Sequence, residues 1–173
     1  VLSITAGRVD GENVTATGTG SFNSRNVLEA DRVTVESVAL ADGIGSSPVS
    51  QIASAAAVRS FLDDYFATSE AWSVRRAAQR VLQATNSWLH AQNQRGDARF
   101  NKDCGFVCTF SALLLKGRHL HLLHVGDARV FRVHARALEQ LTEDHRVQVS
   151  SSESYLARAL GATLRVVAPE QVE

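Results

Sequence analysis

The chain has 173 residues, of which 45% are hydrophobic and 21% charged, and its 18 Lys and Arg are balanced by 18 Asp and Glu. A zero net charge argues against a general nucleic-acid-binding surface, and no apolar run is long enough to span a membrane. This length predicts one domain, residues 1–173, or part of one. Because the chain starts at Val1 and has no Met, we expect a piece of a longer protein.

The N-terminal part predicts strands separated by polar segments. Alternation over 2–6 indicates an opening strand, and the Gly-, Thr- and Asn-rich stretch 7–20 predicts a loop or a weak edge strand. The β-branched run 33–40 predicts a strand that ends directly before Asp42 and Gly43.

Two helices are expected next. Ser47 as N-cap and Pro48 at the first helical position start one, with Asp63-Asp64 as its solvated end. A second helix is predicted over about 69–92. Its buried stripe comprises Val74, Ala78, Val81, Leu82, Thr85, Trp88 and Leu89. The polar residues 93–103 predict a mobile connection.

The next segments read as strands. Residues 106–115 predict a strand buried on both faces near its end, and 116–118 turn it into a strand over 119–125. Gly126-Asp127 predicts a hairpin turn into a strand over 128–133. The histidines at 119, 121 and 124 are expected to be polar strand-face residues, the first two on one face and the third on the other.

After a short strand over 136–141, a polar loop is predicted at 147–154. Residues 155–160 predict a short helix capped by Gly161, and 164–168 a last strand stopped by Pro169. Cys104 and Cys108 are expected to be reduced thiols of a cytoplasmic protein, because Cys108 reads as a buried strand residue. No zinc-type ligand spacing surrounds them.

Four ordered segments resemble the metal-dependent Ser/Thr protein phosphatases of the 2C (PPM) type. That family has a strand ending in Asp-Gly-x-Gly-Gly, a later Val-Gly-Asp-Ser-Arg, and then Leu-Thr-x-Asp-His and Leu-Thr-Arg-Ala-Leu-Gly. Here the matching segments read Ala-Asp-Gly-Ile-Gly-Ser at 41–46, Val-Gly-Asp-Ala-Arg at 125–129, Leu-Thr-Glu-Asp-His at 141–145, and Leu-Ala-Arg-Ala-Leu-Gly at 156–161. A lone Asp-Gly favours a simple turn former, whereas four segments in order favour the family.

The resemblance implies a two-metal hydrolase with Mg2+ or Mn2+ as cofactor. Asp42 would bridge two ions, Gly43 would add its backbone carbonyl, and Asp127 would hold a third, looser ion. No catalytic residue is expected beyond the metal ligands. Arg25 is the candidate phosphate-binding residue, with a solvated loop cation as the alternative.

The chain also departs from the family. Leu28-Glu29-Ala30 stands where a metal-binding Asn-Glu-Asp is expected, so a carboxylate is missing unless Glu29 or Asp31 replaces it. Ile44 occupies the place of a His that bacterial relatives also often lack. Two late acidic segments have no match, so we expect an incomplete N-terminal portion of the domain with little activity by itself.

The expected fold follows the family: an α+β, four-layer α/β/β/α sandwich of two antiparallel sheets flanked by helices, truncated at the C-terminus. The expected function is hydrolysis of phosphoserine and phosphothreonine in proteins. Phosphoproteins and a cognate or fused Ser/Thr kinase are the expected partners, with no nucleic acid or membrane. The alternatives are a pseudophosphatase that acts as a regulatory or binding module, and an unrelated α/β protein with structural Asp-Gly turns.

Overall fold

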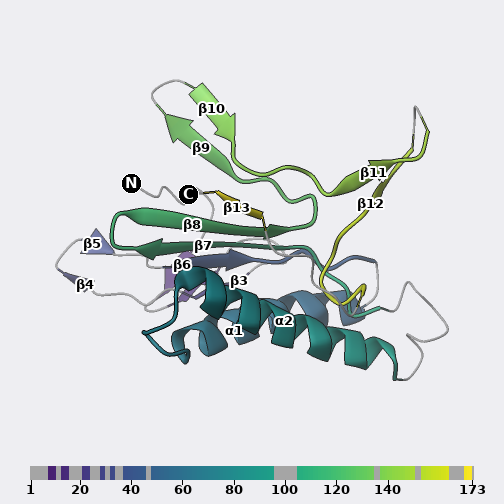
Figure 1. Ribbon diagram of the computed structural model, residues 1–173, viewed down its shortest axis with the longest axis horizontal. Coiled ribbons are helices and arrows are strands. Elements are labelled where there is room, and N and C mark those ends of the chain that lie inside the picture. The colour runs from purple at the N-terminus through teal and green to yellow at the C-terminus, as the bar shows by residue number, and fades with distance from the viewer. Residues whose placement is uncertain are drawn as a thin grey trace.

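A computed structural model describes residues 8–10, 13–15, 21–23, 28–29, 32–33, 37–45, 48–95, 105–134, 137–150, 153–163 and 170–172 (Figure 1). Its elements are β1 (Arg8–Asp10), β2 (Asn13–Thr15), β3 (Ser21–Asn23), β4 (Leu28–Glu29), β5 (Arg32–Val33), β6 (Ser37–Leu40), α1 (Pro48–Phe66), α2 (Val74–Asn93), β7 (Phe110–Lys116), β8 (His119–Val125), β9 (Phe131–His134), β10 (Ala137–Gln140), β11 (Arg146–Gln148), β12 (Ser154–Leu156) and β13 (Glu170–Val172).

A four-stranded antiparallel sheet in the order β13-β8-β7-β6 carries both helices on one face (Figure 1). Ala39, Ala112 and Leu123 are aligned across its three longest strands, and all three are buried against the helices. Small side chains at the first two positions let the helices approach the sheet closely. The predicted α+β class with antiparallel sheets and external helices is therefore confirmed.

Helix α1 packs onto the sheet through small and aromatic residues. Ala53 and Ala57 are fully buried, and the Phe61 ring meets Phe110 of β7 edge-on at 5.0 Å between centroids. Such an edge-to-face pair adds about 0.5–1.5 kcal/mol beyond the buried area. The predicted helix start at Pro48 and the exposure of Asp63-Asp64 are confirmed.

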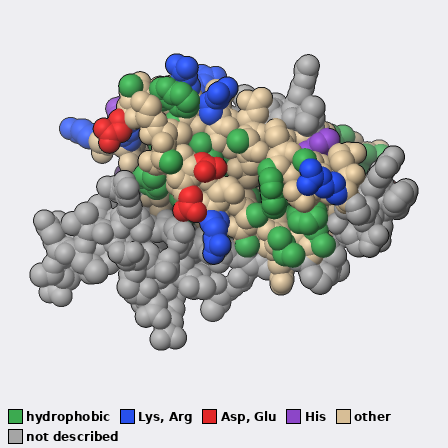
Figure 2. Space-filling model, turned by 90° about the horizontal axis from the view of Figure 1, so that it is seen from below, with side chains coloured by type: hydrophobic (Ala, Val, Ile, Leu, Met, Phe, Trp, Pro, Cys, Tyr) green, Lys and Arg blue, Asp and Glu red, His purple; other side chains and the backbone are tan. Residues whose placement is uncertain are grey.

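Helix α2 begins at Val74, five residues later than predicted. Ser73 has an extended backbone, and its hydroxyl accepts the Arg76 N–H at 3.3 Å, so it is the N-cap. The predicted buried stripe is correct except at Trp88, which is 46% exposed and lies edge-on against Phe106. The helical side seen from below carries hydrophobic side chains interspersed with Lys and Arg (Figure 2). Neither helix of the described chain combines the length and apolarity needed to cross a bilayer.

Smaller strand groups surround the central sheet. Strands β1, β2 and β3 form a three-stranded antiparallel sheet, and β3 lies near β6 and α1. The pairs β4–β5, β9–β10 and β11–β12 are two-stranded, and the last two extend away from the helices (Figure 1). Strands β1 and β2 fall in the segment predicted as a loop or weak edge strand. The predicted strand over 2–6 lies outside the described residues.

Gly126-Asp127 is not a hairpin turn, which corrects the prediction. Strand β8 pairs with β7 and β13, whereas β9 pairs with β10, so the chain leaves the sheet at Gly126. The His145 N–H donates to the Gly126 carbonyl at 2.8 Å. A later segment of the chain therefore packs on Gly126, where a hairpin would have placed the next strand.

The C-terminal part also differs from the sequence prediction. The 147–154 segment contributes to a β11–β12 hairpin instead of a polar loop, and 155–160 is not a helix. Leu160 and Cys108 exchange backbone hydrogen bonds of 3.2 and 2.9 Å, so a strand-like partner replaces the helical bonds. Strand β7 starts at Phe110 and is buried at its start, not near its end. The predicted strand over 164–168 lies outside the described residues, and β13 follows Pro169.

Candidate functional site

Two strand ends that carry an aspartate lie at the same end of the central sheet, where β6 and β8 finish and β7 begins. This end is called the edge of the sheet below. Leu40 of β6, Ser111 of β7 and His124 of β8 are aligned by the antiparallel pairing. Asp42 follows Leu40 by two residues, and Asp127 follows the end of β8 by two, so both leave the sheet at the edge where β7 begins. Two interstrand spacings put the backbones of β6 and β8 roughly 10 Å apart.

Thr109 fixes the backbone of Asp42. The Thr109 N–H donates to the Asp42 carbonyl at 2.8 Å, and the Thr109 hydroxyl lies 3.2 Å from the Asp42 nitrogen as its acceptor. The Asp42 residue is exposed, whereas Thr109 is 3% exposed. The buried Thr109 therefore holds the backbone of the exposed Asp42 through two hydrogen bonds at the edge of the sheet.

The Gly43 carbonyl points away from β7. Gly43 faces Cys108 in an isolated antiparallel bridge, and the bonds that flank it run from Thr109 to Asp42 and from Ile44 to the Val107 carbonyl at 2.9 Å. In this pattern the N–H and C=O of the central residue face the other side. A Cβ at position 43 would lie 2.1 Å from the Ser50 carbonyl oxygen, so only glycine permits this approach of the strand end to α1.

Cys108 is a free, fully buried thiol beneath this edge. Burial, followed by the negative charge of Asp42, raises the pKa of the Cys108 thiol to about 12. The thiol therefore stays neutral and adds no charge to the Asp42 edge. The predicted reduced state is confirmed for Cys108, and Cys104 lies outside the described residues.

Gly126 lies in a network of buried hydrogen bonds. The Ser111 hydroxyl lies 2.9 Å from His124 Nδ1, and His124 Nε2 lies 3.0 Å from the Gly126 carbonyl. Because that carbonyl can only accept, Nε2 donates to it, and in the neutral imidazole Nδ1 accepts from the Ser111 hydroxyl. The Gly126 N–H donates to His145 Nδ1 at 3.0 Å, and the two imidazoles stack at 5.1 Å. Both histidines thus position the residue directly before Asp127.

The three strand histidines differ in exposure. His124 lies in β8 as predicted, but it is only 1% exposed and its ring is held by hydrogen bonds. His119 and His121 do lie on one face, with ring centroids 6.3 Å apart.

Asp127 is paired with Arg146 of β11. The Nη1 group of Arg146 donates to Asp127 Oδ2, and the two side chains are 39% and 29% exposed. Beside them, Arg129 holds Asp144 through bonds of 2.9 and 2.6 Å in a bidentate pair. The hydrogen bond from Arg129 lowers the pKa of the Asp144 carboxyl.

Two of the predicted metal ligands lie side by side in the chain, at the end of β6. The Asp42 carboxylate and the Gly43 carbonyl are hard oxygen donors of the kind that Mg2+ and Mn2+ prefer. No three His, Cys, Asp or Glu side chains in the described ranges come together as a metal site. Arg25 and Asp31 lie outside the described residues, and only the backbone of Glu29 in β4 is described. Metal binding by Asp42, Gly43 and Asp127 stays a prediction.

Sequence reasoning missed the residues that support the two acidic strand ends. Among these supporting residues, only Thr109 stands out in the sequence, because it is a polar residue within the apolar run 106–110. His145 belongs to the family-like segment 141–145, but nothing in that segment indicates its bond to Gly126. Nothing in the sequence around Arg146 indicates that it reaches Asp127.

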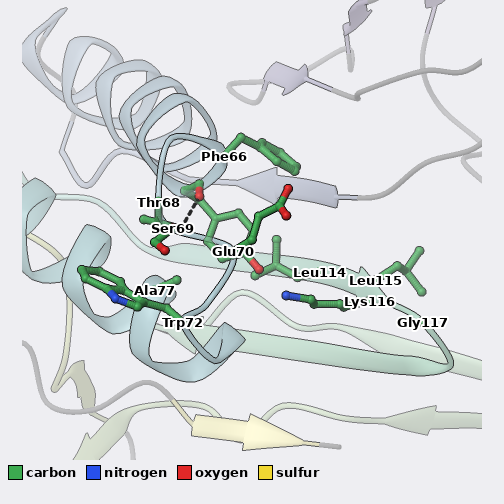
Figure 3. Close-up of a pocket in the computed structure, with 11 residues that line it drawn as sticks. Phe66, Thr68, Ser69, Glu70, Trp72, Ala77, Leu114, Leu115, Lys116 and Gly117 are labelled. Atoms are coloured by element: carbon green, nitrogen blue, oxygen red, sulfur yellow. Dashed lines mark hydrogen bonds between the residues drawn. The ribbon is translucent and has the colours of Figure 1, made fainter.

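A cavity of about 660 Å³ lies at the other end of β7 (Figure 3). Trp72 and Ala77 line it from the helix side, and Leu114 and Lys116 line it from β7. Seven strand residues separate the two ends by roughly 20 Å. The cavity is therefore separate from the edge that carries Asp42 and Asp127.

The fold resembles that of solved bacterial phosphatases. The Mycobacterium tuberculosis serine/threonine phosphatase PstP/Ppp shares 22% identity at a TM-score of 0.62, over 86% of this chain and 69% of that one. The Mycobacterium smegmatis PPM Ser-Thr phosphatase MsPP, solved with cacodylate, shares 21% identity at a TM-score of 0.64, over 91% and 69%. PppA, a key regulatory component of T6SS in Pseudomonas aeruginosa, shares 19% identity at a TM-score of 0.63, over 79% of this chain and 59% of that one. The catalytic domain of PstP has also been solved with two manganese ions.

At these identities the structural likeness concerns the fold. No curated protein matches the sequence. Residues 26–167, most of the chain, match the family model described as Protein phosphatase 2C. The chain therefore belongs to the protein phosphatase 2C family.

Proposed function

We propose that this chain carries part of the catalytic edge of a metal-dependent phosphatase that hydrolyses phosphoserine and phosphothreonine in proteins. One observation supports this proposal above all. Asp42, which follows β6, and Asp127, which follows β8, leave the sheet at the same edge, where the family motifs require them to meet.

Asp42 and Gly43 are the residues proposed to hold the ions. The Asp42 residue is exposed and the Gly43 carbonyl faces away from β7, so one strand end carries two hard oxygen donors. Mg2+ or Mn2+ is the proposed cofactor, supported by the oxygen donors and by the manganese ions of the PstP structure. When bound, such a pair of ions supplies an activated water and a clamp for phosphate oxygens.

Thr109 supports the residue that carries the proposed ligand. Thr109 bonds both the N–H and the carbonyl of Asp42, so the backbone that carries the carboxylate is held in place before an ion arrives. Phosphorylated proteins are the proposed substrates, and a cognate Ser/Thr kinase is the proposed functional partner.

A second candidate is a pseudophosphatase, a binding module that keeps the fold without catalysis. The observation that favours it is the small donor set of the described residues, since two dications need several carboxylates. Leu28 of β4 also stands near the position where the family has a carboxylate.

The test compares Mn2+ binding and phosphopeptide hydrolysis in the chain and two variants. Asp42→Asn removes the proposed ligand, and Asp63→Asn removes an exposed carboxylate from α1 as a matched control. We expect calorimetry to detect Mn2+ binding that is lost in D42N and kept in D63N. We expect the phosphopeptide to be hydrolysed slowly, and only with Asp42 present.

Equal hydrolysis by D42N and the unmodified chain would refute the proposed site. Phosphopeptide binding with neither Mn2+ binding nor hydrolysis would instead support the pseudophosphatase. Rapid turnover by the chain alone would contradict the expectation that it has little activity by itself.

A further inference from the structure

Arg146 makes three contacts that fix its guanidinium between Asp127 and β12. Its Nη1 donates to Asp127, its Nε donates to the Ser154 hydroxyl at 3.0 Å, and its Nη2 donates to the Ser154 carbonyl at 2.9 Å. A planar guanidinium presents its donors in a rigid fork, so these bonds are mutually compatible. One side chain therefore connects the chain segment after β8 with the β11–β12 hairpin.

The charges around Asp127 are already balanced. Arg129 and Asp144 form the neighbouring bidentate pair, and favourable electrostatic interactions link Asp127 to Arg129 and Asp144 to Arg146. Two positive and two negative side chains give this cluster a net charge of zero. A site for a divalent cation needs a surplus of carboxylate charge, and the cluster has none while Arg146 stays in place.

We propose that Arg146 occupies, with its guanidinium, the position at Asp127 that a divalent cation would take, so that cation binding to Asp127 requires Arg146 to leave. This inference rests on the proposed function, because it concerns the same edge of the sheet. In this proposal Arg146 and a divalent cation compete for the Asp127 carboxylate. Arg146 therefore determines how many ions this edge holds.

The exposure of the pair decides how strong this competition is. At 39% and 29% exposure, the ion pair is screened by water and is of the kind that contributes little. Arg146 therefore weakens cation binding without abolishing it. When Arg146 leaves Asp127, its bonds to Ser154 are disturbed, so a cation at Asp127 also loosens the attachment of β12.

The experiment measures Mn2+ affinity and stoichiometry in the 173-residue chain by titration calorimetry and Mn2+ electron paramagnetic resonance. In Arg146→Gln we expect an additional Mn2+, or at least fivefold tighter binding of a weak one. In the double variant R146Q/D127N this gain should disappear. Fivefold corresponds to ~1 kcal/mol, the upper end for an exposed ion pair.

Two variants separate this competition from general charge effects. Arg132→Gln removes the same charge from the exposed Arg132–Glu139 pair of the β9–β10 hairpin and should leave Mn2+ binding unchanged. Arg146→Lys keeps the charge and should bind Mn2+ as weakly as the unmodified chain. A binding gain in R132Q equal to that in R146Q would overturn the proposal.

The remaining outcomes are also decisive. No gain in R146Q overturns the proposal, and so does a gain that persists with D127N. The proposed function fails separately, if Mn2+ binding does not depend on Asp42. A gain in R146Q that requires Asp127 but not Asp42 would support the competition while removing support for the catalytic edge.

Discussion

Replacing Gly126 by Ala tests whether the approach of this residue to Thr109 holds the second acidic strand end in place. Gly126 has φ +123°, and an added Cβ would lie 2.6 Å from the Thr109 Cβ and 2.7 Å from its Cγ2. Real Cβ atoms do not approach so closely, and Thr109 is itself fixed by Asp42. The backbone or the threonine must therefore shift.

The expected cost has two parts. A non-glycine residue in a sparsely populated backbone region costs about 1–3 kcal/mol. Overpacking of a buried contact costs a further ~1–3 kcal/mol. We expect G126A to lower the free energy of unfolding by about 2–6 kcal/mol, a large fraction of the typical stability of a domain.

Gly117→Ala is the matched control. Gly117 has φ +64° in the β7–β8 turn, and an added Cβ meets nothing within 4 Å. It should cost only the left-handed backbone penalty of about 1–2 kcal/mol. Urea unfolding followed by circular dichroism gives both values. If G126A is no more destabilising than G117A, the close packing of Gly126 on Thr109 is not what holds this loop.

Three other predictions concern the core and the charged cluster. In a Cys104→Ser background, Cys108 should resist Ellman's reagent at about pH 8 until the protein is unfolded, because burial keeps its thiol protonated; rapid reaction of the native protein would contradict this. Asn86→Ala should cost about 2–4 kcal/mol in urea unfolding, because this buried side chain bonds two backbone groups at 2.7 and 2.8 Å; a loss below the smaller value would show that water replaces it. Arg129 lowers the pKa of Asp144, so the Arg129→Gln variant should be less stable than the unmodified chain above about pH 4. In an acid titration of stability, this difference should vanish as Asp144 is protonated. A difference that persists in stronger acid would contradict the pairing.

The positions of the two acidic strand ends could be predicted because each follows a β-branched or apolar run directly. The turn at Gly126-Asp127 could not, since a Gly-Asp pair has the same local preference whether the next strand pairs or departs. Contacts from His145 and Thr109, distant in sequence, decide it.

The segment around Leu160 shows the same limit. Its spacing fits a helical turn, but the backbone bonds to Cys108 favour an extended chain. Trp88 fits the buried stripe of α2 by spacing, yet its ring lies at the margin of the packed face, against Phe106. The sequence around Arg146 does not predict its ion pair with Asp127. That pair depends on where β11 lies after the chain has left the central sheet.

The order of the elements along the chain has a consequence for biosynthesis. Strand β6 pairs with β7, and the two strands are separated in sequence by both helices. On the ribosome, α1 and α2 emerge after β6 but before β7 and β8, which cover a further part of their apolar side. That side is exposed until β7 and β8 are made, so a nascent chain halted before Phe110 should be a ligand for chaperones and prone to aggregation.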